Sequence, residues 1–141
     1  MAEVITLGGI KTEIKNGIGT ISFHHPKSNS LPGKILKEFA AAIYAMDENS
    51  EIKVIVIKSE GIGTFCAGAS FDELLYLSDF ETAKENFMGF SNVINAIRKI
   101  NKFVIGRGQG KAVGGGIGLS CAFDYCFAVE TASVKLSELA V

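Results

Sequence analysis

The chain has 141 residues, of which 48% are hydrophobic and 21% are charged, and its formal net charge at neutral pH is −1. This length and composition are typical of one globular domain with a hydrophobic core. Lysines and arginines are scattered along the chain, which excludes the basic surface of a nucleic-acid-binding or anionic-membrane-binding protein, and no apolar stretch is long enough to span a bilayer.

The first predicted elements are a hairpin and a helix. Apolar and polar residues alternate over Ile10–Lys15 and Ile18–Phe23, on either side of Asn16 and Gly17, a dipeptide that accepts the positive φ angles of a tight turn. We expect Pro32 in the first turn of the helix, because apolar residues recur after it at helical spacing: Ile35, Leu36, Phe39, Ala42, Ile43 and Met46.

Strands and helices then alternate along the chain. The apolar run Val54–Ile57 predicts a strand buried on both faces. A long amphipathic helix is expected over Phe80–Ile100, before a strand at Phe103–Ile105. A short helix over Ile117–Ala122 and a buried strand over Tyr125–Val129 complete the pattern. The order hairpin, helix, buried strand indicates an α/β fold built from ββα repeats.

Two glycine-rich stretches, Gly61–Ala69 and Gly108–Gly118, each follow an apolar run and expose backbone amides. Neither has the spacing of a dinucleotide fingerprint, and Lys111 is followed by Ala112 instead of the Ser or Thr of a phosphate-binding loop. Two interpretations remain. The glycines serve tight turns and close packing, or the amides of both stretches form an oxyanion hole, in which donors stabilise a developing negative charge.

Three motifs carry a family resemblance. They are His25-Pro-Lys-Ser-Asn-Ser-Leu31, Phe65-Cys-Ala-Gly-Ala-Ser-Phe71 and Gln109-Gly-Lys-Ala-Val-Gly-Gly-Gly-Ile-Gly-Leu119. Together they resemble the crotonase superfamily, also called the enoyl-CoA hydratase/isomerase family, from about Ile10 to the end of the chain. The resemblance implies a crotonase-like spiral of ββα repeats over residues 1–141, as an amino-terminal core that lacks the carboxyl-terminal helical part of the family.

The resemblance also implies the site residues. The backbone amides of Ala69 and Gly115 would hold the thioester oxygen of an acyl-CoA. Ala67, together with the turn Ala69, Ser70, Phe71 and Asp72, would line the coenzyme A path, although Ser70 stands where the family usually has Asp.

Family hydratases carry two catalytic glutamates. Gly118 occupies the first of these positions, and Glu138 matches the second. We expect the surrounding Leu136, Leu139, Ala140 and Val141 to give Glu138 a partly apolar setting that raises its pKa and suits it to proton transfer. The alternative is an ordinary surface glutamate after a strand.

Other reactive residues have simpler interpretations. His24 and His25 are adjacent on a strand, point to opposite faces and so cannot share one ligand, and we expect both to be solvated. Cys66 lacks an evident base and is predicted to be a small buried thiol. Cys66, Cys121 and Cys126 form no CxxC pair, which argues against a disulfide framework or a metal site and favours the cytoplasm.

The long helix carries an apolar stripe, Phe87, Phe90, Ile94 and Ile97. We expect it to pack in the core, which explains the helical spacing without a ligand, and the alternative is that it lines an acyl pocket. Glu73 and Asp79 lie near the first glycine stretch. We expect them to cap short helices or to be solvated, and the alternative is that they act as surrogate acids near the first loop.

The leading functional hypothesis is an enoyl-CoA hydratase/isomerase type enzyme of fatty acid metabolism, a lyase or an isomerase, with coenzyme A present only as part of the substrate. Two alternatives stay open, namely a non-catalytic acyl-CoA-binding subunit and an inactive fragment of such an enzyme. The resemblance implies an acyl-CoA partner and a homo-oligomer, either a trimer or a dimer of trimers.

Overall fold

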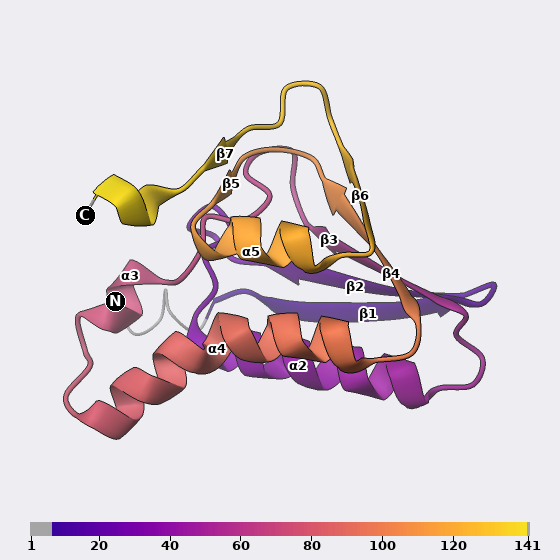
Figure 1. Cartoon of the computed structure of the whole chain (residues 1–141), viewed down its shortest axis with the longest axis horizontal. Coiled ribbons are helices and arrows are strands. Elements are labelled where there is room, and N and C mark those ends of the chain that lie inside the picture. Colours follow the sequence, from indigo (N-terminus) through magenta and orange to yellow (C-terminus); the bar gives the residue numbers. More distant parts are fainter. Residues whose placement is uncertain (1–6, 141) are drawn as a thin grey trace.

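The computed structural model describes residues 7–140, so residues 1–6 and 141 of the predicted domain lie outside it. The fold is α/β, as the sequence predicts (Figure 1). Its first two strands, β1 (Gly9–Lys15) and β2 (Ile18–His24), form the expected antiparallel hairpin. Asn16 and Gly17 form the turn between them, with positive φ angles of 51° and 78°.

The main sheet has five strands in the order β1-β2-β3-β4-β6. Strands β3 (Val54–Ser59), β4 (Phe103–Gly108) and β6 (Tyr125–Ala128) run parallel to β2. Parallel neighbours require crossover connections, and helices supply them.

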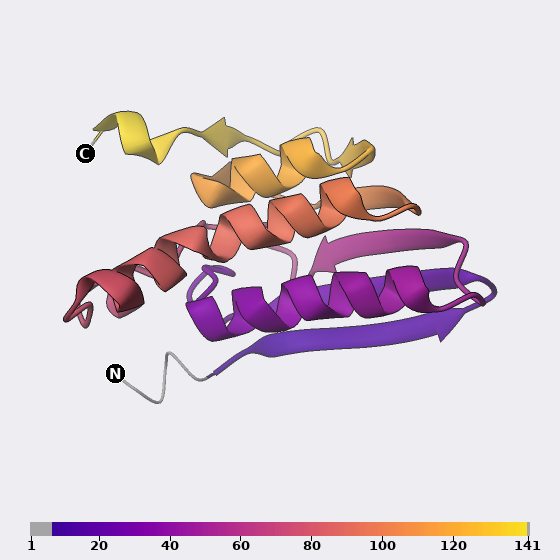
Figure 2. The same ribbon diagram turned by 60° about the horizontal axis from the view of Figure 1, so that its bottom comes forward.

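Helices α2 (Gly33–Glu48) and α4 (Phe80–Lys99) lie side by side along one face of this sheet (Figure 2). The predicted apolar stripe of α2 is buried, including Phe39 and Ile43. Pro32 is not in the first turn, because its ψ of 157° is extended and makes it the residue that precedes the helix.

Two predictions of buried strands are wrong. In β3, Ile55 and Ile57 are fully buried, but Val54 and Val56 on the other face are only partly covered, because the helices lie on one side of the sheet. All four residues of β6 are exposed, because β6 pairs only with β4 and forms the edge of the sheet.

The second glycine-rich stretch is not one loop. Gly108 ends β4, a short strand β5 (Ala112–Val113) follows, and α5 (Gly115–Ala122) begins two residues earlier than predicted. Strand β5 pairs in parallel with β7 (Val134–Lys135), which leads into a 3₁₀ turn, η1 (Ser137–Ala140).

Aromatic rings link the first glycine-rich stretch to the core. Phe23 of β2 lies 5.4 Å from Phe39 of α2 and 5.5 Å from Phe65, measured between ring centroids, and Phe65 is 6.3 Å from Phe123. Rings at these separations attract each other and exclude water. Phe65 is 1% exposed, so the loop that follows it starts from a fixed point.

The stripe of α4 packs as expected only in its second half. Ile97 is buried and Phe90 and Ile94 are partly buried, but Phe87 is 69% exposed because α4 extends beyond the sheet at its amino-terminal end. A short helix, α3 (Phe71–Leu74), precedes this end of α4.

Candidate active site

Backbone hydrogen bonds hold the two glycine-rich stretches side by side. The amide of Phe65 donates to the carbonyl of Lys111 at 2.9 Å, and the amide of Val113 donates to the carbonyl of Cys66 at 2.9 Å. A Cβ on Gly116 would lie 2.4 Å from the carbonyl oxygen of Cys66, so this approach requires a residue without a side chain.

Each predicted oxyanion donor follows a glycine with positive φ. Gly68, before Ala69, has a φ of 91°, and Gly114, before Gly115, has a φ of 55°. The two sites adjoin, because a Cβ on Gly68 would lie 3.3 Å from the nitrogen of Gly115. Glycine turns the chain at both points, and the donor residues are only partly buried.

The hydrogen bonding around the two amides leaves both as potential donors. Gly115 is the first residue of α5, where an amide has no partner one turn earlier in the helix. Within residues 7–140, neither the Ala69 nor the Gly115 amide donates to another backbone carbonyl outside the regular elements. An oxygen placed between them would also meet the positive end of the α5 dipole.

The β5–β7 pairing brings Glu138 next to this pair of amides. The amide of Gly114 donates to the carbonyl of Lys135 at 3.1 Å, and η1 then turns the carboxylate of Glu138 toward Gly114. A Cβ on Gly114 would lie 2.7 Å from Oε1 of Glu138. Three residues that are distant in the sequence, Ala69, Gly115 and Glu138, therefore belong to one region.

The apolar setting expected around Glu138 is not formed by the described residues. Glu138 is exposed, and the side chains of Leu136 and Leu139 are 58% and 85% exposed. The prediction inferred burial from apolar neighbours in sequence, but Leu136 and the 3₁₀ turn that follows it lie at the surface, where Leu136 and Leu139 are exposed. Val141 lies outside the described residues.

Helix α4 packs against α5 beside the donors. A Cβ on Gly115 would lie 2.9 Å from the ring of Phe90, and a Cβ on Gly118 would lie 3.2 Å from Cδ1 of Ile94. The position at which family hydratases have their first acid therefore faces α4 in this chain. Phe90 was predicted to pack in the core, with the lining of an acyl pocket as the alternative, and its ring lies against the candidate donor Gly115.

The residues expected along the coenzyme A path differ in accessibility. Ala67 and Ala69 are partly buried, and Phe71 is 71% exposed. Ser70 is 2% exposed and its Oγ has no hydrogen-bond partner within residues 7–140, so any contact with a ligand would come from its backbone. The carboxylate of Asp72 is already engaged, because Oδ2 lies 2.5 Å from Nζ of Lys27.

The two histidines do not share one environment. His24 is exposed as predicted, but His25 is only 1% exposed, so the prediction that both are solvated is wrong for His25. Its Nδ1 accepts a hydrogen bond from the amide of Lys27 at 3.3 Å and lies 3.4 Å from Oγ of Ser30. The sequence could not show that the turn after His25 buries its ring, because adjacent residues in the sequence do not indicate which segment covers a side chain.

Cys66 is the buried thiol that the sequence predicts. Its side chain is fully buried, and burial raises the pKa of this thiol to about 12, because the thiolate is poorly solvated there. A thiol that stays protonated is a poor nucleophile. Cys66 therefore contributes packing, and its backbone joins the two glycine-rich stretches.

Glu73 and Asp79 both cap helices, but these are the long helices α2 and α4, not the short helices that were expected. Oδ1 of Asp79 accepts the amide of Thr82 at 2.8 Å at the start of α4. Oε2 of Glu73 accepts the amide of Gly33 at 2.7 Å, so a residue of α3 caps α2, which has no acidic residue in its own first turn. The sequence could not indicate this long-range cap.

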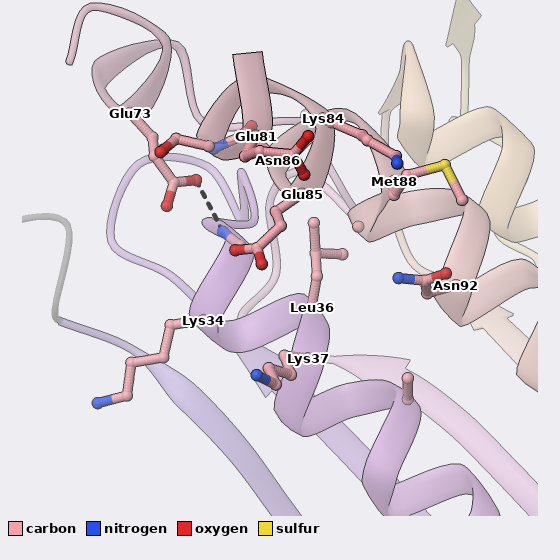
Figure 3. A pocket seen from close by; sticks show the side chains of 14 residues that line it. Lys34, Leu36, Lys37, Glu73, Glu81, Lys84, Glu85, Asn86, Met88 and Asn92 are labelled. Atoms are coloured by element: carbon pink, nitrogen blue, oxygen red, sulfur yellow. Dashed lines mark hydrogen bonds between the residues drawn. The ribbon is translucent and has the colours of Figure 1, made fainter. Parts of the chain in front are cut away.

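A groove of about 620 Å³ lies between α2 and α4, and Glu73 and Gly33 meet at its rim (Figure 3). None of the predicted site residues lines it. Its charged residues offer both signs, and include Lys34, Lys37, Lys84, Glu81 and Glu85. The groove therefore presents no single charge that would select an anionic or cationic ligand.

Residues 7–140 contain no group of three or more His, Cys, Asp or Glu side chains placed to hold a metal ion. In the same part, no helix combines the length and apolar character needed to cross a membrane.

Comparisons with known proteins agree with the motifs. Residues 13–141 match the family described as enoyl-CoA hydratase/isomerase. The chain is 30% identical over 129 residues to 4-chlorobenzoyl coenzyme A dehalogenase-1 of an Arthrobacter species, covering 88% of this chain and 46% of that protein. It is 33% identical over 111 residues to human mitochondrial methylglutaconyl-CoA hydratase, covering 78% of this chain and 32% of that protein.

The fold agrees as well. The crystal structure of an enoyl-CoA hydratase from Bacillus anthracis superposes with a TM-score of 0.86 at 25% identity, covering 94% of this chain and 52% of that one. The crotonase-like fold predicted from the motifs is therefore confirmed. The chain spans about half the length, or less, of these proteins.

Proposed function

Because this chain belongs to the enoyl-CoA hydratase/isomerase family, we propose that it carries the part of an acyl-CoA enzyme that stabilises a thioester enolate. The amides of Ala69 and Gly115 bind the thioester oxygen, and Glu138 transfers the proton. The observation that carries the proposal is that the glycines before both donors have positive φ and that the Glu138 carboxylate lies beside Gly114.

The chemistry follows from the thioester. The Glu138 carboxylate takes a proton from the α-carbon, and the electron pair of the broken C–H bond becomes the enolate, whose negative charge resides largely on oxygen. Two amides directed at that oxygen stabilise the charge, and removal of one such donor typically costs about 10²–10³-fold in rate. The proton then returns to carbon from Glu138, at the α-position or at the γ-position of an enoyl chain.

This arrangement favours proton transfer over simple hydration. Hydration of a double bond also requires a group that positions water, and Gly118 offers no side chain for this task. We therefore propose α-proton exchange or double-bond migration as the main activity, with weak hydration of simple enoyl-CoA thioesters.

The test is exchange of the α-proton of a short acyl-CoA in heavy water, followed by NMR. Glu138→Gln should slow exchange by about 10²–10⁴-fold, the usual contribution of a positioned acid or base. The control is Glu130→Gln, the same change at another exposed glutamate. Equal exchange rates in the wild type and Glu138→Gln would show that Glu138 is not the base.

A second candidate is a non-catalytic acyl-CoA-binding subunit, which the solvent exposure of Glu138 favours. Isothermal titration calorimetry combined with the exchange assay separates the two. Binding of acyl-CoA without exchange across short and long acyl chains would support the binding subunit. Exchange that depends on Glu138 would exclude it.

We further propose that the acyl-CoA substrate belongs to fatty acid metabolism and that the protein acts in the cytoplasm as a homo-oligomer, either a trimer or a dimer of trimers. The exposed apolar side chains of Phe103, Tyr125 and Phe127 support assembly, because such surface is usually covered in a complex. Light scattering tests this proposal, and a strictly monomeric species would contradict it.

A further inference from the structure

The turn between β2 and α2, residues 25–31, resembles a family motif, yet the proposed chemistry uses none of its side chains. Its backbone is unusual. Ser28 and Asn29 are consecutive non-glycine residues in the left-handed region, with φ angles of 52° and 54°. Such residues are strained, and they persist where the surrounding contacts hold them in place.

The side chain of Asn29 supplies these contacts. It is 5% exposed, and its Oδ1 accepts the amide of His25 at 2.9 Å. Its Nδ2 donates to the carbonyls of Glu60 at 3.1 Å and Thr64 at 3.0 Å. One amide group therefore joins the turn to Glu60, which directly precedes the first glycine-rich stretch, and to Thr64 within it.

The same turn also holds the far end of that stretch. The amide of Leu31 donates to the carbonyl of Gly68 at 2.8 Å, in a parallel bridge that pairs Leu31 with Ala69. Asn29 fixes the entry of the loop at Glu60 and Thr64, and Leu31 fixes its exit. The residue at that exit, Ala69, is the proposed oxyanion donor.

We propose that Asn29 is a positioning residue for the Ala69 amide. This inference rests on the proposed function for its catalytic consequence. Through Glu60 and Thr64, the Asn29 side chain restricts the loop that carries the donor, so the amide is already aimed when the oxygen becomes negative. An amide that must be ordered during the reaction stabilises the transition state less.

A competing explanation is that the second stretch alone holds the loop. Phe65 and Cys66 both donate to the carbonyl of Lys111, and these contacts do not involve Asn29. If they suffice, loss of the Asn29 donors would leave Ala69 unchanged. The experiment must therefore measure the order of the Ala69 amide directly.

The variant Asn29→Asp separates the two sets of bonds. It keeps an oxygen for the His25 amide and replaces the two N–H donors with an oxygen that repels the carbonyls of Glu60 and Thr64. Asn49→Asp is the matched control, because Asn49 is half-buried and its Oδ1 accepts only the amide of Glu51, at 2.9 Å, in a solvent-exposed hydrogen bond. Asn29→Gly is the second variant, since glycine adopts the left-handed φ without strain.

The first readout is the ¹⁵N order parameter of the Ala69 amide in the folded protein without ligand. It should fall from the rigid range of about 0.85 to below about 0.7 in Asn29→Asp and Asn29→Gly, while that of Gly115 stays unchanged. An unchanged Ala69 value in either folded Asn29 variant would overturn the proposal. This measurement needs no catalysis, so it also decides the matter if the wild type exchanges no α-protons and the proposed function fails.

The second readout is kinetic. In the exchange assay, kcat should fall by about 10–100-fold in both Asn29 variants with KM changed by less than about threefold, because the lost contact acts mainly in the transition state. Asn49→Asp should match the wild type. A rise in KM with kcat unchanged would also overturn the proposal, because it would assign Asn29 to substrate binding.

Discussion

The contact between Gly116 and Cys66 provides a direct test of how the two glycine-rich stretches are held together. Gly116 is buried in α5, and a Cβ at this position would lie 2.4 Å from the carbonyl oxygen of Cys66 and 2.9 Å from its Cβ. Both atoms belong to a buried segment and cannot rotate away. Gly116→Ala must therefore push the two stretches apart.

The size of the displacement follows from these distances. Ordinary van der Waals contact begins at about 3.4 Å, so the 2.4 Å separation must grow by about 1 Å. Overpacking of this kind costs about 1–3 kcal/mol, and the better helix propensity of alanine returns up to about 1 kcal/mol. We expect a net loss of up to about 3 kcal/mol in the free energy of unfolding, and of about 2 kcal/mol where the overpacking cost is at its upper end and alanine returns its full gain. A donor pair separated by about 1 Å should lose about 10²-fold in kcat/KM.

Gly118→Ala is the matched control within the same helix. Its Cβ would lie 3.2 Å from Cδ1 of Ile94, a side-chain end that can move by a few tenths of an ångström. Urea unfolding should show this variant to be as stable as the wild type, or up to about 1 kcal/mol more stable, with α-proton exchange retained. Equal stability and equal exchange in Gly116→Ala and Gly118→Ala would refute the inference that close approach of the two stretches forms the site.

Other predictions concern single groups. Burial raises the pKa of Cys66 to about 12, so a thiol reagent at pH 8 should modify the exposed Cys121 and should modify Cys66 only after unfolding. Rapid labelling of Cys66 in the native protein would contradict this prediction. The pKa of Asp79 is lowered by hydrogen bonds from the amide and hydroxyl of Thr82, so the stability that this carboxylate contributes is present above its unfolded pKa and is lost as the pH falls through its folded pKa. On acidification, the melting temperature should therefore fall more in the wild type than in Asp79→Asn. Parallel curves of melting temperature against pH would exclude this linkage. The ammonium group of Lys102 donates to the carbonyls of Met46 and Asn49 near the end of α2, at 2.6 and 2.5 Å. Lys102→Met should therefore lower the free energy of unfolding by about 1–3 kcal/mol. An unchanged urea midpoint would show that water replaces these bonds.

Local patterns predicted most of the elements. Asn16 and Gly17 marked the hairpin because few residue pairs accept two positive φ angles, and the apolar spacing of α2 and α4 marked helices with one buried face. The burial of β6 was predicted wrongly. An apolar run shows that a strand can be buried, but the position at the edge of the sheet depends on which strands pair with it.

The candidate site shows a similar division. Motif matches named Ala69, Gly115 and Glu138, and the structure places these residues in one region. The exposure of Glu138, by contrast, was not predicted, because neighbours in sequence do not determine which side chains cover a carboxylate. The cap that Glu73 provides for α2 could not be predicted from the sequence for a related reason, since the donor and the acceptor lie 40 residues apart.

The sequence by itself determined the hairpin turn and the amphipathic helices, since these depend on residue type and short-range spacing, and the resemblance of its motifs to a family proposed Ala69 and Gly115 as candidate donors. Only the tertiary structure decided that Gly68 adjoins Gly115, that Glu138 lies beside Gly114, and that Asn29 joins the first turn to the first glycine-rich stretch. The physical reason is that these relations rest on hydrogen bonds and close contacts between distant segments, whose partners are chosen only when the whole chain packs.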